Sequence, residues 1–429
     1  MRNFIVVWLG QTVSLIGSQM TNFAITVWVW ELTGQATALA LFGLLTQLPR
    51  VMVTPFAGII VDRCNRKLLM MIGDAIASFS AIIILLLYLT NNLQIWHLYL
   101  AGAINGIFEQ LQELAYLASI SMMVSKEQYS RASSIGFLAS YGSDIIAPAL
   151  AGFLYAVIGL IGILIIDLAT FAIALLTVLF VNIPQPAHVE PEPLCRTNIQ
   201  QQVVFGCRYI VTRPSLLVLL MLETLFWFAH DLGAPLYSPM ILARTGNDAK
   251  VLASLASAAG IGGVVGALLV SAWGGTKRRI HGMLIGTIGV GLSKTAFGLG
   301  QMLLIWIPAQ FCSSLNFPLL GSSSDAIWLT QIKPDVQGRV FAARRVSILV
   351  ASTIGYLIAG PLADYVFEPA MISGNSLAAV FGGIFGTGKG AGMTLLYVIS
   401  SLGLLLVGLS GYAFRVLREI DVESGCDQK

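Results

Sequence analysis

The stretch "NGIFEQLQELAY" places two carboxyl groups, Glu109 and Glu113, inside an otherwise largely apolar run. Residues four apart lie on one face of a helix. Desolvation and mutual repulsion both favour the protonated form of a carboxyl group, so the pair can hold a proton at neutral pH. We therefore predict that Glu109 and Glu113 take part in proton coupling and substrate binding. The alternative is an internal salt bridge that only fixes packing.

Two further ionisable residues lie in apolar runs of the N-terminal half. Arg50, in "LTQLPRVMV", is its lone strong cation there, and Glu109, Glu113 or Asp144 would each end its isolation. Its role is a structural ion pair or direct contact with a substrate. Asp144 precedes Pro148, which removes a backbone donor and bends a helix. Asp144 and Pro148 together predict a hinge with a titratable group, and Asp144 is a further proton-coupling candidate.

A third group of polar residues lies in "LLMLETLFWFAHDLGAPLY" of the C-terminal half. Glu223 and His230 are seven apart and share a helix face, while Asp231 is one step round it. A histidine titrates near neutrality, which suits a proton step. Glu223 and Asp231 are predicted to help proton coupling. His230, with Phe226 and Trp227, is predicted to contact an apolar substrate, with packing or lipid contact as the alternative for the aromatic rings.

Several other chemistries are excluded by the residue patterns. Nothing completes a metal site, no Walker A motif, catalytic triad or HExxH appears, and no cofactor is expected, so the protein is not predicted to be an enzyme. The glycines of "GIGGVVGALL" (260–269) indicate close helix packing. Lys294 is expected to snorkel to the outer surface. Asp325 is expected to pair with the basic loop that follows it.

The elements that position these residues are membrane helices. The chain has 429 residues, of which 56% are hydrophobic and 10% charged. Apolar runs of about 20 residues recur, the length that crosses the hydrocarbon core, and helices satisfy their backbone there. We predict an all-α membrane protein with 12 transmembrane helices. The expected spans are 4–31, 37–61, 68–90, 96–122, 131–156, 160–183, 214–242, 251–273, 280–299, 302–330, 340–366 and 391–417.

The basic residues predict the orientation of these helices. An even number of spans puts both termini on one side, and 19 of the 24 Lys and Arg residues fall there, Arg344 among them. The opposite loops hold only Arg244, Lys250 and Lys389. Positive residues stay inside, so both termini are predicted to be cytoplasmic, in a multi-pass protein of the inner (plasma) membrane. The first run begins close to Met1 and is predicted to be a retained helix. Because the basic residues are dispersed, no nucleic-acid partner is expected.

The chain is predicted to consist of two pseudo-symmetric six-helix bundles, residues 1–183 and 214–429. The one long polar segment, 184–213, joins them as a cytoplasmic linker that opens proline-rich and then forms an amphipathic helix. The halves echo each other: "DRCNRK" and "GGTKRR" follow the second and eighth spans, and "DIIAPALAG" and "YLIAGPLAD" lie in the fifth and eleventh. Two such halves around a midplane site are typical of transporters.

Two motifs resemble those of the major facilitator superfamily, over nearly the full length. The loop signature G-x-x-x-D-[RK]-x-G-x-[RK]-[RK], with small offsets allowed, is matched by Gly58, Asp62, Arg63, Arg66 and Lys67, with Asn65 near the place of the second glycine. The antiporter signature G-P-x-x-x-G is matched in part by Ala147, Pro148 and Gly152. "IWLTQIKPDVQGRVFAARR", "AGPLADYVFEPAM" and "FGTGKGAGM" are similar to the macrolide-efflux and siderophore-exporter branch of drug:proton antiporters. That branch often has an arginine where this chain has Asn105.

The resemblance implies a secondary active exporter of a hydrophobic or amphiphilic small molecule, driven by protons and acting by alternating access in the lipid bilayer as a monomer. It also implies that the loop residues matched above, with Pro148 and Gly152, control conformational gating; the alternative is that the loop is only a charge anchor. Two other functions stay open. One is an uncoupled facilitator or importer of the same fold, which Asn105 favours. The other is a membrane sensor or assembly subunit that does not transport.

Overall fold

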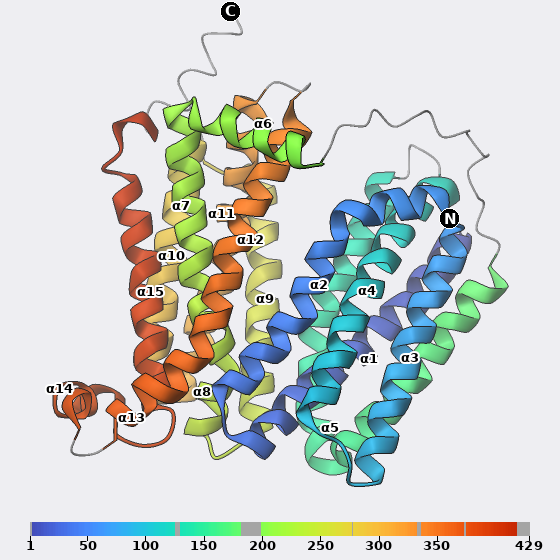
Figure 1. The fold of residues 1–429 in the computed structure, drawn as a ribbon, viewed down its shortest axis with the longest axis horizontal. Coiled ribbons are helices and arrows are strands. Elements are labelled where there is room, and N and C mark those ends of the chain that lie inside the picture. Colours follow the sequence, from blue (N-terminus) through green and yellow to red (C-terminus); the bar gives the residue numbers. More distant parts are fainter. Residues whose placement is uncertain are drawn as a thin grey trace, which may run out of the picture. The chain divides into compact units, whose positions relative to one another are not determined.

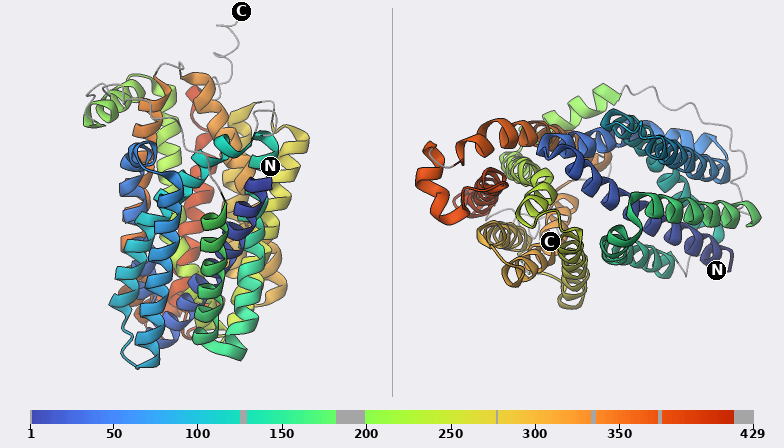
Figure 2. Two further views of the ribbon diagram at one scale, coloured as in Figure 1. Left: turned by 90° about the vertical axis from the view of Figure 1, so that its right-hand side faces the viewer. Right: turned by 90° about the horizontal axis from the view of Figure 1, so that it is seen from below.

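The computed structural model describes a chain that is almost entirely helical, with no strand among the described residues. The contacts divide it into two compact units. Unit 1 comprises residues 1–190 and 245–257, and unit 2 comprises 191–244 and 258–429. Figures 1 and 2 show the helices of each unit running alongside one another. The described residues are 2–124, 129–181, 199–276, 278–332, 336–372 and 375–417.

Unit 1 contains five long helices, and α5 is broken near its middle. α1 packs along α5, α2 packs along α4, and α3 contacts both α4 and α5. Inside α5, Gly159 has φ 61° and ψ −166°, a conformation that glycine adopts without steric cost. The break lies between the expected spans 131–156 and 160–183. The helices are α1 (Arg2–Thr33), α2 (Ala36–Arg63), α3 (Arg66–Leu89), α4 (Ile95–Met123) and α5 (Tyr129–Phe180).

Unit 2 contains the remaining long helices and several short ones. Its first helix, α6, falls where the sequence predicts an amphipathic helix. The helix α9 starts in the 245–257 segment and continues into unit 2. The helices are α6 (Ile199–Val211), α7 (Pro214–Gly233), α8 (Tyr237–Arg244), α9 (Ala249–Trp273), α10 (Arg279–Leu299), α11 (Leu303–Gln331), α12 (Gln337–Leu362), α13 (Glu368–Ala370), α14 (Ser376–Phe385) and α15 (Ala391–Gly411).

Ten helices of the described residues are long and apolar enough to cross a membrane. One of them, residues 142–180, is 39 residues long and contains the break at Gly159. α4 is not among the ten, although it has 29 residues. The fold is therefore that of a multi-pass helical membrane protein.

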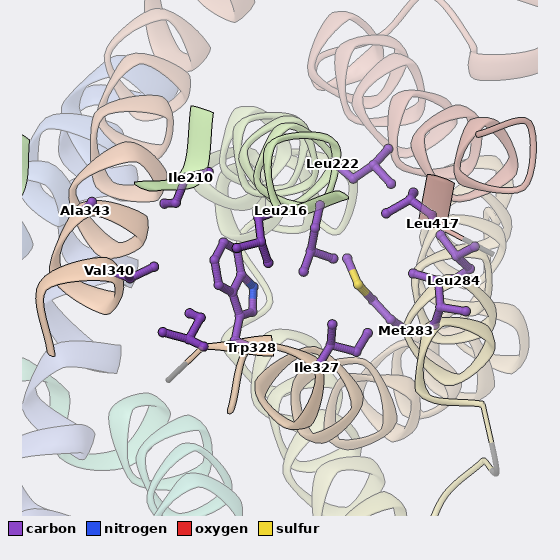
Figure 3. Packing of buried hydrophobic residues seen from close by; sticks show 13 residues of the cluster. Ile210, Leu216, Leu222, Met283, Leu284, Ile327, Trp328, Val340, Ala343 and Leu417 are labelled. Atoms are coloured by element: carbon purple, nitrogen blue, oxygen red, sulfur yellow. The ribbon is translucent and has the colours of Figure 1, made fainter. Parts of the chain in front are cut away.

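The core of unit 2 surrounds Trp328 of α11, whose side chain is fully buried. Figure 3 shows it between Leu216 of α7 and Val340 of α12, with Met283 of α10 further along the same cluster. The small residues of α9 bring helices together as predicted: a Cβ on Gly262 would clash with the α11 backbone at the Phe311 carbonyl. This packing holds the polar residues of α7, α11 and α12 in fixed positions.

Candidate functional site

The first polar cluster, which we call the Arg50 cluster, lies between α2 and α4 in unit 1. Arg50 Nη2 lies 2.5 Å from Glu113 Oε2, and Arg50 Nη1 lies 3.5 Å from Glu109 Oε1. Arg50 Nε also donates to Gln110 Oε1 at 3.1 Å. The helical spacing thus places both predicted carboxylates on the face of α4 that meets Arg50. Asp144, the other partner considered for Arg50, does not join them.

Small residues allow α2 and α4 to approach each other at this cluster. A Cβ built on Gly106 of α4 would overlap the Thr46 carbonyl oxygen of α2 and lie 3.6 Å from the Arg50 Cβ. One turn earlier, a Cβ on Gly102 would lie 2.6 Å from the Thr46 hydroxyl oxygen. The close contact of the two backbones is what lets the Arg50 guanidinium reach two successive turns of α4.

We predict that Gly106→Ala disturbs this approach, because the added methyl group has backbone rather than a flexible side chain in its way. Overpacking of this kind costs about 1–3 kcal/mol, so the apparent unfolding temperature should fall. Gly142→Ala in α5 is the matched control, since its Cβ would meet nothing within 4 Å and alanine favours a helix. Thermal unfolding followed by tryptophan fluorescence compares the two. Equal behaviour of both variants would contradict the close approach.

The Arg50 cluster carries more negative than positive charge. Two carboxylates share one guanidinium, and the side chains of Glu109 and Glu113 are 53% and 49% exposed while Arg50 is 29% exposed. The shorter contact binds Glu113 to Arg50, and the longer one leaves Glu109 less engaged. A cluster with one surplus carboxylate can accept a proton or a cationic group.

A neighbouring network on α3 was not singled out from the sequence. Asp74, 1% exposed, accepts hydrogen bonds from Gln112 Nε2 at 2.6 Å and from Gln11 Nε2 at 3.1 Å. Ser80 of the same helix donates to Asn105 Oδ1 at 2.9 Å. Asp167 of α5 is also buried, at 2% exposed. The only sequence signal for Asp74 and Asp167 was a single aspartate within an apolar run.

The second polar cluster lies in unit 2 and holds Glu223 of α7 in an ion pair. Arg344 of α12 donates from Nε to Glu223 Oε2 and from Nη2 to Glu223 Oε1, both at 2.9 Å. Trp328 Nε1 donates to the same carboxylate, and Ser324 also binds it. Arg344 Nη1 reaches Asp325 at 3.0 Å. Arg344, which was counted with the cations of the basic side, lies inside α12, within the expected span 340–366. Asp325 was expected to pair with the basic loop that follows it; in the structure its partner is Arg344 inside α12.

The third cluster is formed near the end of α7 by His230 and Asp231. His230 Nδ1 lies 2.8 Å from Asp231 Oδ1, and the Ser352 hydroxyl of α12 donates to Asp231 Oδ2. The rings of Trp227 and Phe317 lie edge-on to the imidazole, each with its centroid 5.4 Å from the imidazole centroid. These contacts join α7, α11 and α12 around one polar pair.

Phe226 packs in the core, which was the alternative to substrate contact, and Lys294 lies elsewhere than expected. Phe226 is 2% exposed and packs in a core cluster with Val290 and Leu404, whereas Trp227 is only partly buried. Lys294 of α10 points inward: its Nζ lies 5.9 Å from the centroid of the Tyr397 ring of α15. The expectation that Lys294 snorkels to the outer surface was wrong, because its inward environment includes an aromatic face and the charge of Asp231.

The predicted hinge residues of α5 lie within unit 1. Asp144 is exposed and makes no hydrogen bond or ion pair within the described part of the chain. Pro148 lies inside α5. A Cβ on Gly152 would clash with Ala253 of the 245–257 segment. Gly152 therefore serves a close helix contact, and its gating role stays a prediction.

The loop signature between α2 and α3 makes local contacts. The Asn65 side chain accepts from the Leu68 amide at 3.2 Å and so caps α3, which explains why asparagine serves in place of the second glycine. Lys67 Nζ donates to the Leu179 and Val181 carbonyls at 2.8 and 3.0 Å, and Arg66 donates to the Ala118 carbonyl at 2.8 Å. The cations thus bind the final carbonyls of α5 and a late carbonyl of α4. The surroundings of Gly58 and the side chains of Asp62 and Arg63 lie outside the described part.

Long apolar helices that carry ion pairs within their bundles are features of a polytopic membrane protein. The family model described as "Major Facilitator Superfamily" matches residues 7–356. The chain belongs to this superfamily, as the sequence predicted. Macrolide efflux protein A of Streptococcus pyogenes is 28% identical over 370 residues, which cover 85% of this chain and 90% of that protein.

Other relatives agree with the predicted branch. The enterobactin exporter EntS of Escherichia coli O1:K1 is 24% identical over 89% of this chain and 90% of its own length. Among solved structures, a POT family transporter in complex with a thioalcohol-conjugated peptide has a TM-score of 0.71 at 12% identity, covering 98% of this chain and 96% of the other. A bacterial homologue of ferroportin has a TM-score of 0.69 at 15% identity, covering 98% of each chain. At these identities the structures establish only the fold.

Proposed function

We propose that the protein is a secondary active exporter of a hydrophobic or amphiphilic small molecule, driven by proton antiport with alternating access. The observation that carries this is the Arg50 cluster, in which two carboxylates on α4 share one guanidinium of α2. The relatives named for macrolide efflux and enterobactin export support outward transport and suggest a drug, macrolide, siderophore or peptide-like natural product as the substrate.

The two carboxylates have different roles in this mechanism. Glu113 is the fixed partner of the guanidinium, because its Oε2 lies only 2.5 Å from Arg50 Nη2. Glu109, whose nearest guanidinium nitrogen is 3.5 Å away, takes and releases the proton. With Glu109 ionised, the cluster has one surplus negative charge, which a proton or a cationic or hydrogen-bonding group of the substrate neutralises. Competition between proton and substrate for this charge couples the two flows.

The membrane arrangement of the proposal has 12 spans in two six-helix bundles. The ten candidate spans, the division of α5 at Gly159 and the length of α4 support that number. The excess of basic residues on one side supports cytoplasmic termini in the inner membrane. The working unit is a monomer. Residues 1–183 rock against 214–429, and the loop at 58–67 with Pro148 and Gly152 controls this movement.

A second candidate function is an uncoupled facilitator of the same fold. It is favoured by Asn105, which stands where relatives of this branch often have an arginine and which makes a neutral hydrogen bond with Ser80. Arg50 of α2 lies beside Gly106 and so brings a guanidinium to the adjacent turn of α4. Because Arg50 of α2 would take the place of the arginine that α4 lacks, we favour the coupled exporter.

Proton release on ligand binding tests the proposal. Purified protein in weakly buffered detergent solution with an indicator dye receives a macrolide or enterobactin, the compounds in the relatives' names. Wild type is expected to release protons, and the variant Glu109→Gln with Glu113→Gln is expected to release none. Equal release from both would remove the pair from the mechanism. Binding without release in wild type would favour the facilitator.

A further inference from the structure

Lys294 is a charged residue in the interior of unit 2 that takes no part in the ion pairs described above. Its ammonium group makes no hydrogen bond and no ion pair with any residue in the part of the chain that the structure describes. It lies inside the bundle, with Nζ 5.9 Å from the centroid of the Tyr397 ring. An ammonium group has three donors, and a cation within a membrane bundle usually has a partner or a function.

The nearby carboxylate does not supply that partner. Asp231 interacts electrostatically with Lys294, but its Oδ1 is engaged by His230 and its Oδ2 by Ser352. The other carboxylate of α7, Glu223, is held by Arg344. Both acidic residues of α7 therefore have other partners, and the donors of Lys294 remain for a group that the described part of the chain does not provide.

Aromatic rings surround the Lys294 ammonium group and the His230–Asp231 pair. Trp227 and Phe317 contact the His230 ring, and Tyr397 presents its ring to the ammonium. Trp227, His230 and Phe317 are only partly buried, in contrast to Phe226. Aromatic faces beside a fixed cation suit a ligand that has a planar apolar body and an anionic oxygen group. A cationic ligand would meet repulsion from Lys294.

We propose that Lys294 with the His230–Asp231–Ser352 group forms a binding site in unit 2 for the carboxylate-type end of an aromatic amphiphile. Lys294 donates to the anionic oxygens, and Trp227 and Phe317 contact the apolar body. Asp231 is kept from Lys294 by its hydrogen bonds to His230 and Ser352, so it does not occupy the site. This site would give the proposed exporter a substrate class, aromatic amphiphiles with an anionic end. Its physiological meaning rests on the proposed function.

The test compares two fluorescent probes that differ in charge and little in shape, 9-anthracenecarboxylate and 9-anthracenemethanol. Quenching of tryptophan fluorescence in lipid nanodiscs, corrected with empty discs, gives each affinity. Wild type is expected to bind the carboxylate about tenfold more tightly than the alcohol, because Lys294 forms a charge-assisted hydrogen bond with the carboxylate that the alcohol cannot match. Lys294→Gln should remove this preference and Lys294→Arg should keep it.

Two controls locate the effect. Lys250→Gln changes an exposed lysine of the 245–257 segment and should leave the preference intact. Trp227→Phe should weaken the quenching by the carboxylate, because a tryptophan beside the site is lost. Equal affinity of the two probes in wild type would overturn the proposal, as would a preference that survives Lys294→Gln. Binding needs neither a proton gradient nor transport, so an uncoupled facilitator with this site would also prefer the carboxylate probe. If the probes bind without this preference, the proton-release experiment on Glu109 and Glu113 can still succeed.

Discussion

Arg344→Met is expected to lower the free energy of unfolding by about 3–5 kcal/mol, the loss typical when one partner of a buried ion pair is removed. Glu223 is 4% exposed, and Arg344 binds both of its oxygens at 2.9 Å. Methionine keeps most of the side-chain length but leaves the carboxylate without its counter-ion. Thermal unfolding in detergent, followed by tryptophan fluorescence, should show a large fall in the apparent unfolding temperature.

The chain provides a matched control for this variant. Arg345 is adjacent, exposed, and makes no hydrogen bond or ion pair within the described residues, so Arg345→Met should leave the unfolding temperature unchanged. Adding Glu223→Gln to Arg344→Met removes the unpaired charge, while the amide oxygen still accepts from Trp328. The double variant should recover much of the loss. Equal effects of the two arginine substitutions would show that the ion pair does not stabilise unit 2.

Glu109→Gln is expected to abolish export driven by a pH gradient while leaving the protein folded. The Arg50–Glu113 contact at 2.5 Å remains in this variant, so the helix pair α2–α4 keeps its ion pair. The group that exchanges the proton is gone, so accumulation of a macrolide in inverted vesicles should fall to the level seen without a gradient. Exchange of labelled for unlabelled macrolide, which needs no net proton movement, should continue.

Glu113→Gln should behave differently, because it removes the partner that Arg50 holds more closely. Glu109 is then the remaining carboxylate for the guanidinium, which favours its charged form and weakens the competition with the proton. Gradient-driven export should be reduced but measurable. The expected change in stability is about 0–1 kcal/mol, as for an exposed pair. Intact gradient-driven export in Glu109→Gln together with complete loss in Glu113→Gln would reverse the assigned roles.

The sequence could predict features that depend on local spacing. Glu109 and Glu113 share a helix face because they are four apart, and Arg50 was a predicted partner because no other strong cation lies in the interior of the N-terminal half. The break at Gly159 and the amphipathic α6 followed from the ends of apolar runs and from the polar linker.

Features that depend on distant contacts were not predictable in the same way. The partners of Asp74 are 63 and 38 residues away, so nothing near it in the chain indicated a network. Arg344 and Arg345 are adjacent and were counted together among the cations of one side, and only the packing of α12 on α7 separates their roles. The inward position of Lys294 likewise depends on Tyr397, which is 103 residues further along the chain.

In the ion pairs of Arg50 and Arg344, both partners belong to the same unit. An interaction that is equally strong in two conformations shifts no equilibrium between them. In a rocking cycle the Arg344–Glu223 pair would thus contribute equally to every state, whereas the charge of the Arg50 cluster changes as Glu109 takes and releases the proton. Weaker contacts would set the barriers between the outward-open and inward-open states and the populations of the two states. Loss of the Arg344 pair would therefore shorten the lifetime of the folded protein without changing its rate of transport.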